Sequence, residues 1–346
     1  MKKKTKNLIG ISFLVVSLAV SAFFIPWSLL FMRLSPLPDS IQTEIENTVA
    51  KRNIDGIIVY IDEAGEVSKF SAGYNDRDAK TEAHPDLLFK IASISKLYMA
   101  VAAAKLVDRG NLSLDATLSE LLTEYKDDIQ YAYEITLRML IQHRSGIPEY
   151  VYDPDIPWEN LTANVYDFLP FVLGKDADFK PNARYKYSNT NYFLLGKIMD
   201  DAIGYTHNHF IKEEILIPNQ LNDTYYYYNE TNPEDVMSGY DVGYDFDFKP
   251  IDHIIPGGTM VASITDVGVF LRALNNGSLL TNSEQAIYSE IYVYEHTGLL
   301  AGYQSIARYD SESDTVIIVF VNTSGGDSWG KIEALHDRIV RINARN

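Results

Sequence analysis

The sequence contains no cysteine. Disulfide bonds and zinc sites built from thiolates are therefore excluded. Basic residues are also scarce, with 30 Lys and Arg against 47 Asp and Glu, which gives a net charge of −17. Because such an acidic surface repels phosphate groups, no binding to nucleic acid is expected.

The histidines do not indicate a metal site either. His207 and His209 lie two residues apart, so on a helix their side chains point in different directions, and no carboxylate partner stands out. We expect both at the surface, and we predict no metal and no cofactor. The pair Gly257-Gly258 is not followed by the Gly-Lys-Ser/Thr signature of a phosphate-binding loop.

The N-terminus carries a membrane signal. Lysines at positions 2, 3, 4 and 6 precede the uncharged, mostly apolar run Leu8–Met32. As a helix this run would be about 37 Å long, enough to cross a bilayer core of about 30 Å. Lysines before such a run favour a cytoplasmic N-terminus and a globular part outside the cytoplasm. We predict that residues 1–34 form a single-pass anchor in the cell membrane.

A cleaved signal peptide is the alternative for the same segment. Its apolar core would be Leu8–Val20, followed by small residues near a cut, and the protein would then be secreted. The apolar run continues beyond that point, which favours the anchor. Residues 35–40 then predict a short stiff linker that leads into one domain over residues 41–346.

Runs typical of strands lie at both ends of that domain. Gly56–Ile61 and Val67–Gly73 predict a hairpin, and residues 289–297, 302–309 and 315–321 predict three further strands. Helical spacing dominates the middle, where we predict a helical subdomain from about residue 101 to 240. Strands at both ends imply one antiparallel sheet that closes late. The predicted fold class is α+β, an antiparallel sheet flanked by helices with an inserted helical subdomain.

Ser93 and Lys96 stand at the start of the alanine-rich run Leu97–Val107, which ends at Gly110 and predicts a helix. Three residues apart, they share one helix face. A serine hydroxyl is a weak nucleophile until a base takes its proton, and a lysine amine can do so when burial lowers its pKa. The pair alone is a weak signal, because Ser-x-x-Lys occurs by chance in many chains.

Two further motifs follow in the chain. Tyr187-Ser188-Asn189 precedes a helical run, and His296-Thr297-Gly298 lies at the end of a predicted strand. The order of the three motifs resembles that of the penicillin-recognising serine enzymes, which include class C β-lactamases, D-Ala-D-Ala carboxypeptidases, aminopeptidases and related esterases. Residues 135–148, which end in His-x-Ser-Gly-Ile-Pro, and residues 187–196 also resemble that family. The resemblance covers roughly residues 41–346.

The resemblance implies catalytic roles. Ser93 would attack a carbonyl group and become acylated, and Lys96 would take the serine proton. Tyr187 would pass a proton to the leaving group, as a phenol made more acidic by Lys96. Asn189 would bind the amide carbonyl of the substrate and steady Lys96. We expect a packed or helix-terminal role for His143 rather than that of a catalytic base.

The third motif would form the opposite wall of the site. The strand that carries His296, Thr297 and Gly298 would pair with the substrate as a neighbouring strand does. Backbone N–H groups of Ser93 and Leu299 would form the oxyanion hole. His296 replaces the lysine of the commoner Lys-Thr-Gly motif. Since neutral histidine holds a carboxylate less strongly than a permanent ammonium, peptidase or esterase activity is favoured over antibiotic hydrolysis.

The segments 149–159 and 225–250 are less informative. Residues 149–159 are acidic and rich in proline, which predicts a surface loop, and no separate glutamate for activating a deacylating water stands out. Deacylation would then rely on Tyr187 and Lys96. The tyrosine-rich residues 225–250 fit either a lid packed by its own rings or an aromatic wall of the pocket.

The sequence as a whole predicts an extracytoplasmic serine hydrolase. The expected substrate is a small molecule or peptide, with peptidoglycan fragments as one source: a D-amino-acid peptide first, then an ester, then a β-lactam. Two alternatives remain open. One is a penicillin-binding or sensor module that acylates slowly, and the other is a cell-wall transpeptidase.

Overall fold

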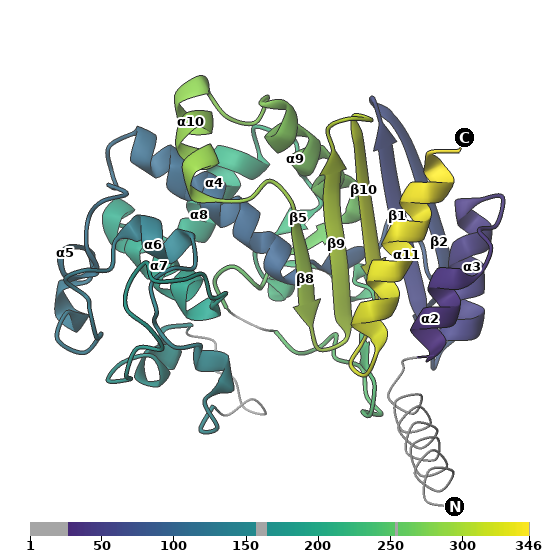
Figure 1. Ribbon diagram of the computed structural model, residues 1–346, viewed down its shortest axis with the longest axis horizontal. Helices are drawn as coiled ribbons and strands as arrows, with labels where there is room; N and C mark the ends of the chain where they lie inside the picture. The colour runs from purple at the N-terminus through teal and green to yellow at the C-terminus, as the bar shows by residue number, and fades with distance from the viewer. Residues whose placement is uncertain (1–26, 157–164, 253–254, 346) are drawn as a thin grey trace, which may run out of the picture.

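The computed structural model describes residues 27–156, 165–252 and 255–345 (Figure 1). Within these residues a six-stranded sheet, in the order β3-β2-β1-β10-β9-β8, places the first strands beside the last. Its neighbouring strands pair antiparallel, and because β1 pairs with β10, the sheet closes only when the C-terminal strands form. The strands are β1 (Gly56–Glu63), β2 (Glu66–Asp76), β3 (Thr81–Glu82), β8 (His296–Leu300), β9 (Tyr303–Asp310) and β10 (Thr315–Val321).

Strand β10 shows why the sheet lies in the middle of the domain. All of its residues are buried. Ile317 and Val319 contribute to the core on one face, and Ile318 and Phe320 contribute to the core on the other. A β-branched, apolar run fits such a central strand because successive side chains point to opposite faces.

Helices cover both faces of this sheet (Figure 1). One face carries α2 (Trp27–Leu34), α3 (Ile41–Arg52) and α11 (Ser328–Asn343). The other face carries α9 (Ile264–Asn276), against which α4 (Ser95–Asp108) packs through the stacked rings of Phe270 and Tyr98. The fold is therefore mixed α+β with an antiparallel sheet between helices, which confirms the predicted class.

The remaining helices lie on the side of α4 away from the sheet (Figure 1). They are α5 (Leu118–Leu121), α6 (Leu137–Ile141), α7 (Asn189–Ile203), α8 (His207–Ile211) and α10 (Asn282–Ile291). Short 3-10 segments are η1 (Ala92–Ile94), η2 (Thr123–Tyr125), η3 (Tyr150–Tyr152), η4 (Val165–Phe171), η6 (Tyr228–Glu230) and η7 (Pro233–Asp235), and η5 (Lys212–Leu216) is a π-helical turn. The bounds of a separate helical subdomain, about 101–240, stay a prediction.

Two small sheets accompany the six-stranded sheet. β4 (Leu88–Lys90), β7 (Val261–Ser263) and β5 (Thr224–Tyr225) form one, in the order β4-β7-β5. β11 (Thr323–Ser324) and β6 (Tyr240–Asp241) form the other. Strand β4 leads directly into η1 and α4, so this pairing fixes both the turn that carries Ser93 and the start of the helix that carries Lys96.

The prediction of a strand at residues 289–297 was wrong. Helix α10 reaches Ile291, and β8 begins only at His296. A capping box starts the helix, because the Thr281 side chain accepts from the Glu284 N–H and the Glu284 carboxylate accepts from the Thr281 N–H. Consequently His296 opens a strand instead of closing one.

The predicted anchor lies mostly outside the described residues, and only its end, from Trp27, belongs to α2. In the described part of the chain, no helix is long and apolar enough to cross a membrane. Helix α2 packs on α11, and Met32 is buried. Arg338 of α11 donates to the carbonyl oxygens of Met32 and Ser35 at 2.8 Å and of Pro36 at 3.0 Å, so the start of the predicted linker is bound to the domain.

Candidate active site

Ser93 lies in η1, the tight turn between β4 and α4. Ala92, the residue before it, has φ 51°, a left-handed conformation that costs an alanine roughly 1 kcal/mol. The Ser95 hydroxyl holds this turn, since it donates to the Ala92 carbonyl at 2.6 Å and accepts from the Met260 N–H at 3.2 Å. The strained turn places Ser93 on the wall of a cavity at the start of α4.

Lys96 is fully buried one turn beyond Ser93. Its Nζ lies 3.1 Å from Ser93 Oγ, 2.9 Å from the Asn189 Oδ1 and 2.8 Å from the Gly257 carbonyl oxygen. Burial lowers the pKa of Lys96 to about 7, although the charge of Glu149 opposes the shift. At neutral pH a substantial fraction of Lys96 is therefore the free amine.

The three partners of Lys96 match a neutral amine. Such an amine has two N–H groups and one lone pair. The Asn189 and Gly257 oxygens can only accept, so they take the two N–H groups. The lone pair then faces Ser93, whose hydroxyl can donate to it. In this geometry Lys96 could accept the serine proton.

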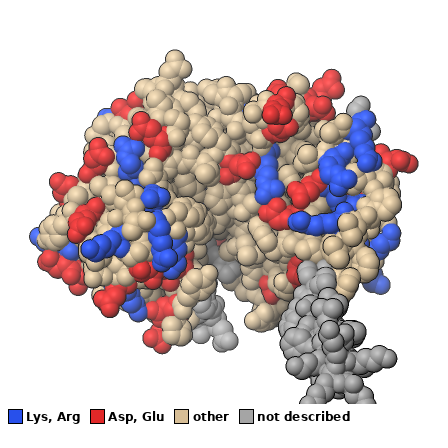
Figure 2. Space-filling view, viewed as in Figure 1, with Lys and Arg blue, Asp and Glu red and all other residues tan. Residues whose placement is uncertain are grey.

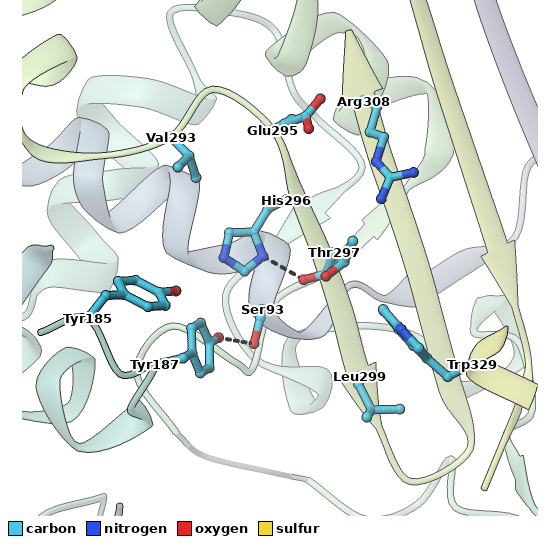
Figure 3. Close-up of a pocket in the computed structure, with 10 residues that line it drawn as sticks. All are labelled: Ser93, Tyr185, Tyr187, Val293, Glu295, His296, Thr297, Leu299, Arg308 and Trp329. Atoms are coloured by element: carbon cyan, nitrogen blue, oxygen red, sulfur yellow. Dashed lines mark hydrogen bonds between the residues drawn. The ribbon is translucent and has the colours of Figure 1, made fainter. Parts of the chain in front are cut away.

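Tyr187 stands on the other side of Ser93, and its hydroxyl donates to Ser93 Oγ at 2.7 Å (Figure 3). The expectation of an acidified phenol was wrong. Burial raises the pKa of Tyr187 well above its ordinary value, and the charge of Glu149 raises it further. Tyr187 therefore remains a protonated hydrogen-bond donor at neutral pH.

His143 and the start of α7 hold the second motif in place. The His143 ring packs on the Tyr187 ring at 4.5 Å between centroids, and its Nδ1 accepts from the Ser188 N–H at 3.2 Å. Burial lowers the pKa of His143 to about 3, so the ring is neutral. The structure places His143 in a packed role just beyond the end of α6, as the sequence predicts.

The sequence interpretation missed Glu149. The acidic loop beginning there was expected at the surface, yet Glu149 accepts hydrogen bonds from both the backbone and the side chain of Asn189. Its position directly after Gly146-Ile147-Pro148, the end of a motif segment, was an available signal. The acidic, proline-rich composition instead favoured a surface loop with solvated side chains.

Strand β8 forms the opposite wall and carries Thr297, Gly298 and Leu299. It is an edge strand of the sheet, paired only with β9 in the described residues, so its other edge can pair with an extended substrate. At Gly298 an added Cβ would lie 2.3 Å from the Ile91 carbonyl oxygen and 3.0 Å from the Ala92 Cβ. Only glycine lets β8 approach the Ser93 turn this closely.

Both ring nitrogens of His296 are hydrogen-bonded to neighbouring residues of this wall. Its Nδ1 donates to the Thr297 carbonyl oxygen at 2.5 Å, so the Nε2 is left to accept from the Tyr292 hydroxyl at 2.9 Å. Burial lowers the pKa of His296 to about 4, and nearby Lys96 lowers it further. At neutral pH this wall therefore presents an uncharged ring where a lysine would present a cation.

The cavity between the two walls has a volume of about 460 Å³. Most of its lining is uncharged, and the space-filling view shows a hollow between the helix-rich side and the sheet, with most charged groups away from it (Figure 2). Arg308 points toward the cavity from β9, but Glu333 pairs with it at 3.1 Å. The lining residues are Ser93, Tyr185, Tyr187, Val293, Glu295, His296, Thr297, Leu299, Arg308 and Trp329.

The segment 225–250 does not line this cavity. The rings of Tyr244, Phe246 and Phe248 pack on one another, which agrees with a segment packed by its own rings. Lys90 of β4 ties it to the site, because its Nζ donates to the Lys249 and Ile251 carbonyls at 2.7 and 2.6 Å. The interpretation as an aromatic wall of the pocket finds no support in the lining residues.

The surface prediction for His207 was wrong. Its ring is buried, with Nδ1 against an Asp200 oxygen at 2.7 Å and Nε2 against the Tyr226 hydroxyl at 2.6 Å. Helix α8 packs on α7 and brings these partners together, which spacing along the chain does not reveal. His209 is exposed as expected. In the described ranges no group of three His, Asp or Glu side chains could hold a metal ion.

The comparison with protein families agrees with this geometry. A family model described as Beta-lactamase matches residues 41–290, most of the chain. The chain belongs to the Beta-lactamase family. The matched residues include Ser93, Lys96, Tyr187 and Asn189, whereas His296 and the rest of β8 lie beyond them.

Two curated relatives of this family cover different shares of the chain. Penicillin-binding protein 4* of Bacillus subtilis (strain 168) is 28% identical over 220 residues, 62% of this chain and 47% of that protein. Protein flp of Staphylococcus aureus (strain MW2) is 28% identical over 333 residues, 87% of this chain and 66% of that protein. The chain thus spans about half to two thirds of the length of these relatives.

Solved structures share the fold over nearly their whole length. A D-amino acid amidase from Ochrobactrum anthropi SV3, complexed with L-phenylalanine amide, has a TM-score of 0.76 at 24% identity and covers 88% of this chain and 98% of its own. A class C β-lactamase from Rhodobacter sphaeroides has a TM-score of 0.69 at 20% identity, with 88% and 99% covered. Family membership and fold therefore agree for this chain.

Proposed function

We propose that the protein hydrolyses an amide, peptide or ester bond of a D-amino-acid compound through an acyl-enzyme on Ser93. The observation that carries this proposal is the environment of Lys96. Two carbonyl oxygens occupy its N–H groups, and its Nζ lies 3.1 Å from Ser93 Oγ. A base and a nucleophile in direct contact are what acyl transfer to serine requires.

The first step forms the acyl-enzyme. Lys96 takes the hydroxyl proton while Ser93 Oγ bonds to the substrate carbonyl carbon, whose oxygen becomes an oxyanion. The family resemblance assigns that oxyanion to the backbone N–H groups of Ser93 and Leu299, and one such donor is typically worth about 10²–10³ in rate. Tyr187 then donates its proton to the leaving group as the carbon–heteroatom bond breaks, and the Lys96 ammonium restores the phenol.

The second step releases the acid. Lys96, now neutral again, takes a proton from water, which attacks the ester carbon. Ser93 Oγ leaves and is protonated through Tyr187 and Lys96, which returns every group to its starting state. We assign no second base to this step. Glu149, the carboxylate whose charge acts on Lys96, already accepts two hydrogen bonds from Asn189.

The cavity favours a substrate that is neutral where it meets the β8 wall. His296 is uncharged, and the Arg308 guanidinium is paired with Glu333. A free substrate carboxylate would find no unpaired permanent cation among the lining residues, whereas the exposed apolar side chains of Val293 and Leu299 suit an amide or ester with an apolar group. The names of two similar structures, a D-amino acid amidase and a D-stereospecific amidohydrolase, support D-amino-acid amides as the substrate class.

Labelling and turnover test this function. The purified protein is treated with a fluorophosphonate probe and then offered D- and L-amino-acid amides, p-nitrophenyl esters, D-Ala-D-Ala peptides and nitrocefin. We expect Ser93-dependent labelling and faster release from D-amides than from L-amides or from peptides ending in a free carboxylate. Labelling that persists in Ser93→Ala would contradict the mechanism. Faster turnover of peptides that end in a free carboxylate would contradict the substrate class.

A slow-acylating penicillin-binding module is the second candidate. It is favoured by the similarity to Penicillin-binding protein 4* and to the penicillin binding protein from Bacillus halodurans, which has a TM-score of 0.71. Fluorescent penicillin separates the two functions. A stable, Ser93-dependent penicillin adduct without turnover of any amide or ester would support this module over the hydrolase.

We also propose that the domain works outside the cytoplasm, held by the segment 1–34. The lysines at positions 2, 3, 4 and 6 and the apolar run Leu8–Met32 support this location. Fractionation of cells that express the full chain tests it. We expect the protein in the membrane fraction, accessible to external protease once the cell wall is removed. A protease-protected soluble protein would contradict this location.

A further inference from the structure

We propose that Glu149 is a positioning residue of the active site, whose carboxylate fixes the orientation of the Asn189 side-chain amide against Lys96. The inference rests on the proposed reaction at Ser93. In the described residues Glu149 makes no hydrogen bond to Ser93 and does not line the cavity, so it acts through Asn189.

The carboxylate itself is held in place. Its Oε2 accepts from the Asn189 N–H at 2.5 Å and from the Asn189 Nδ2 at 3.2 Å, and its Oε1 accepts from the Val151 N–H at 3.3 Å. The surrounding loop is also bound to α7. The Thr190 hydroxyl donates to the Pro148 carbonyl at 2.6 Å and accepts from the Tyr150 N–H at 2.9 Å. Glu149 thus meets the first turn of α7 in one geometry.

An amide between a carboxylate and an amine can satisfy both in only one orientation. The Asn189 oxygen must face Lys96, whose N–H groups need an acceptor, and the Asn189 nitrogen must face Glu149, which can only accept. Without the carboxylate the amide could rotate and turn its N–H groups toward Lys96. The amine would then lose one of the two acceptors that direct its lone pair at Ser93.

Glu149 also supplies charge. When Lys96 takes the serine proton it becomes an ammonium in a buried site, and a nearby carboxylate stabilises it. The other titratable groups facing this pair in the described structure are Tyr150, Tyr187, Tyr192, His143 and His296. Burial raises the pKa of the three tyrosines and lowers that of the two histidines, so all five are neutral at pH 7. Glu149 is therefore the charge that Lys96 meets: burial raises the pKa of Glu149, but its hydrogen bonds from Asn189 and Val151 and the charge of Lys96 favour the ionised form.

The variant Glu149→Gln separates charge from geometry, because the glutamine oxygen can still accept both Asn189 hydrogen bonds. The readout is the rate of fluorophosphonate labelling of the full chain as a function of pH. Removal of the negative charge disfavours the ammonium, so the pH at which labelling loses half its rate on the acid side should fall by about one unit. Asp153→Asn removes a charge from the same loop at a site facing Lys175, and should leave the profile unchanged.

A second pair of variants tests the path through Asn189. Glu149→Ala and Asn189→Ala should each slow labelling by about tenfold or more, and the double variant should be no slower than Asn189→Ala alone, because residues that act through one contact are not additive. Glu149→Asp keeps the charge with a shorter reach, so it should slow labelling without moving the acid limb. This variant keeps the test open if Glu149→Gln does not fold.

An acid limb unchanged or raised in Glu149→Gln, or additive losses in the double variant, would overturn the role of Glu149. These outcomes differ from a failure of the proposed function, in which Ser93→Ala would label as fast as the unaltered protein. Thermal melting accompanies each variant, since a merely structural role would lower the melting temperature and leave the pH profile in place.

Discussion

The two walls of the cavity differ in how extensively their side chains are hydrogen-bonded. On the helix side, Ser93, Lys96, Tyr187 and Asn189 are linked by hydrogen bonds of 2.7 to 3.1 Å, and Lys96 is fully buried. Each side chain there has at least one partner that fixes its direction. A network of this kind holds reacting atoms within the narrow geometry that proton transfer needs.

On the sheet side, the side chains nearest solvent make few such bonds. Val293 is 51% exposed and Leu299 is 55% exposed, and both line the cavity. Their position can change without breaking the network at Ser93. Under the proposed function, we expect the buried wall to perform the chemistry and the open wall to select the substrate. Substitutions on the two walls should therefore fail in different ways.

Loss of Lys96 should break the buried wall most completely. Lys96→Met removes the base and leaves the volume filled, so we expect fluorophosphonate labelling of Ser93 to slow by about 10³-fold. Lys51→Met, at an exposed position of α3, serves as the matched control and should label normally. Labelling of Lys96→Met within a factor of a few of the unaltered protein would show that another group takes the proton.

Gly298→Ala should break the contact between the walls. Its Cβ would lie 2.3 Å from the Ile91 carbonyl oxygen, so the turn that carries Ser93 or the strand β8 must move. A displacement of about 1 Å at such a site can cost about 10²-fold in rate. Gly258→Ala is the control, because its Cβ would meet nothing nearer than 3.6 Å. Equal labelling rates for the two variants would contradict this close approach.

The pH dependence of the labelling rate should reflect the ionisation of Lys96 in the buried wall. Lys96 has a pKa lowered to about 7 and must be neutral to accept the serine proton. As pH falls below 7 the ammonium form accumulates, so labelling should slow by about tenfold per pH unit, while above 7 it should level off. Labelling rates measured from pH 5 to 9 check this limb. A flat profile down to pH 5 would mean that Lys96 is not the base.

Leu299→Ala should have the smallest effect and should change selection only. The backbone N–H remains, so turnover of a small ester should keep its kcat. We expect KM for a substrate with a large apolar group to rise by no more than about tenfold, since half of the side chain is exposed. Leu34→Ala, on α2, is the control. A fall in kcat for every substrate would place Leu299 with the buried wall instead.

Much of the fold followed from local pattern. Thr315–Val321 is β-branched at every position except Phe320 and apolar after Thr315, and the structure forms β10 over those residues. The alanine-rich run Leu97–Val107 predicts a helix, and α4 covers it as Ser95–Asp108. The strand expected at 289–297 was wrong because the capping box at Thr281 and Glu284 starts a helix that runs to Ile291.

The site divides in a similar way. Ser93 and Lys96 are three residues apart, so a helix start brings them together, and the motif order placed Tyr187 and Asn189 with them. Glu149 was not placed, because its acidic loop predicts a solvated side chain, and the one available signal, its position after Gly146-Ile147-Pro148, does not name the partner it meets 40 residues later. His207 was misplaced for the same reason, since α7 and a residue of the following segment, Tyr226, supply its partners.

By itself the sequence determined which side chains could carry the chemistry and which faces of the strands and helices are apolar, because spacing and side-chain type are local properties. The tertiary structure decided their charge states. Burial makes Lys96 a base near pH 7, keeps Tyr187 protonated and leaves His296 neutral. These shifts arise from desolvation and from neighbours distant in the chain, which only the folded packing brings together.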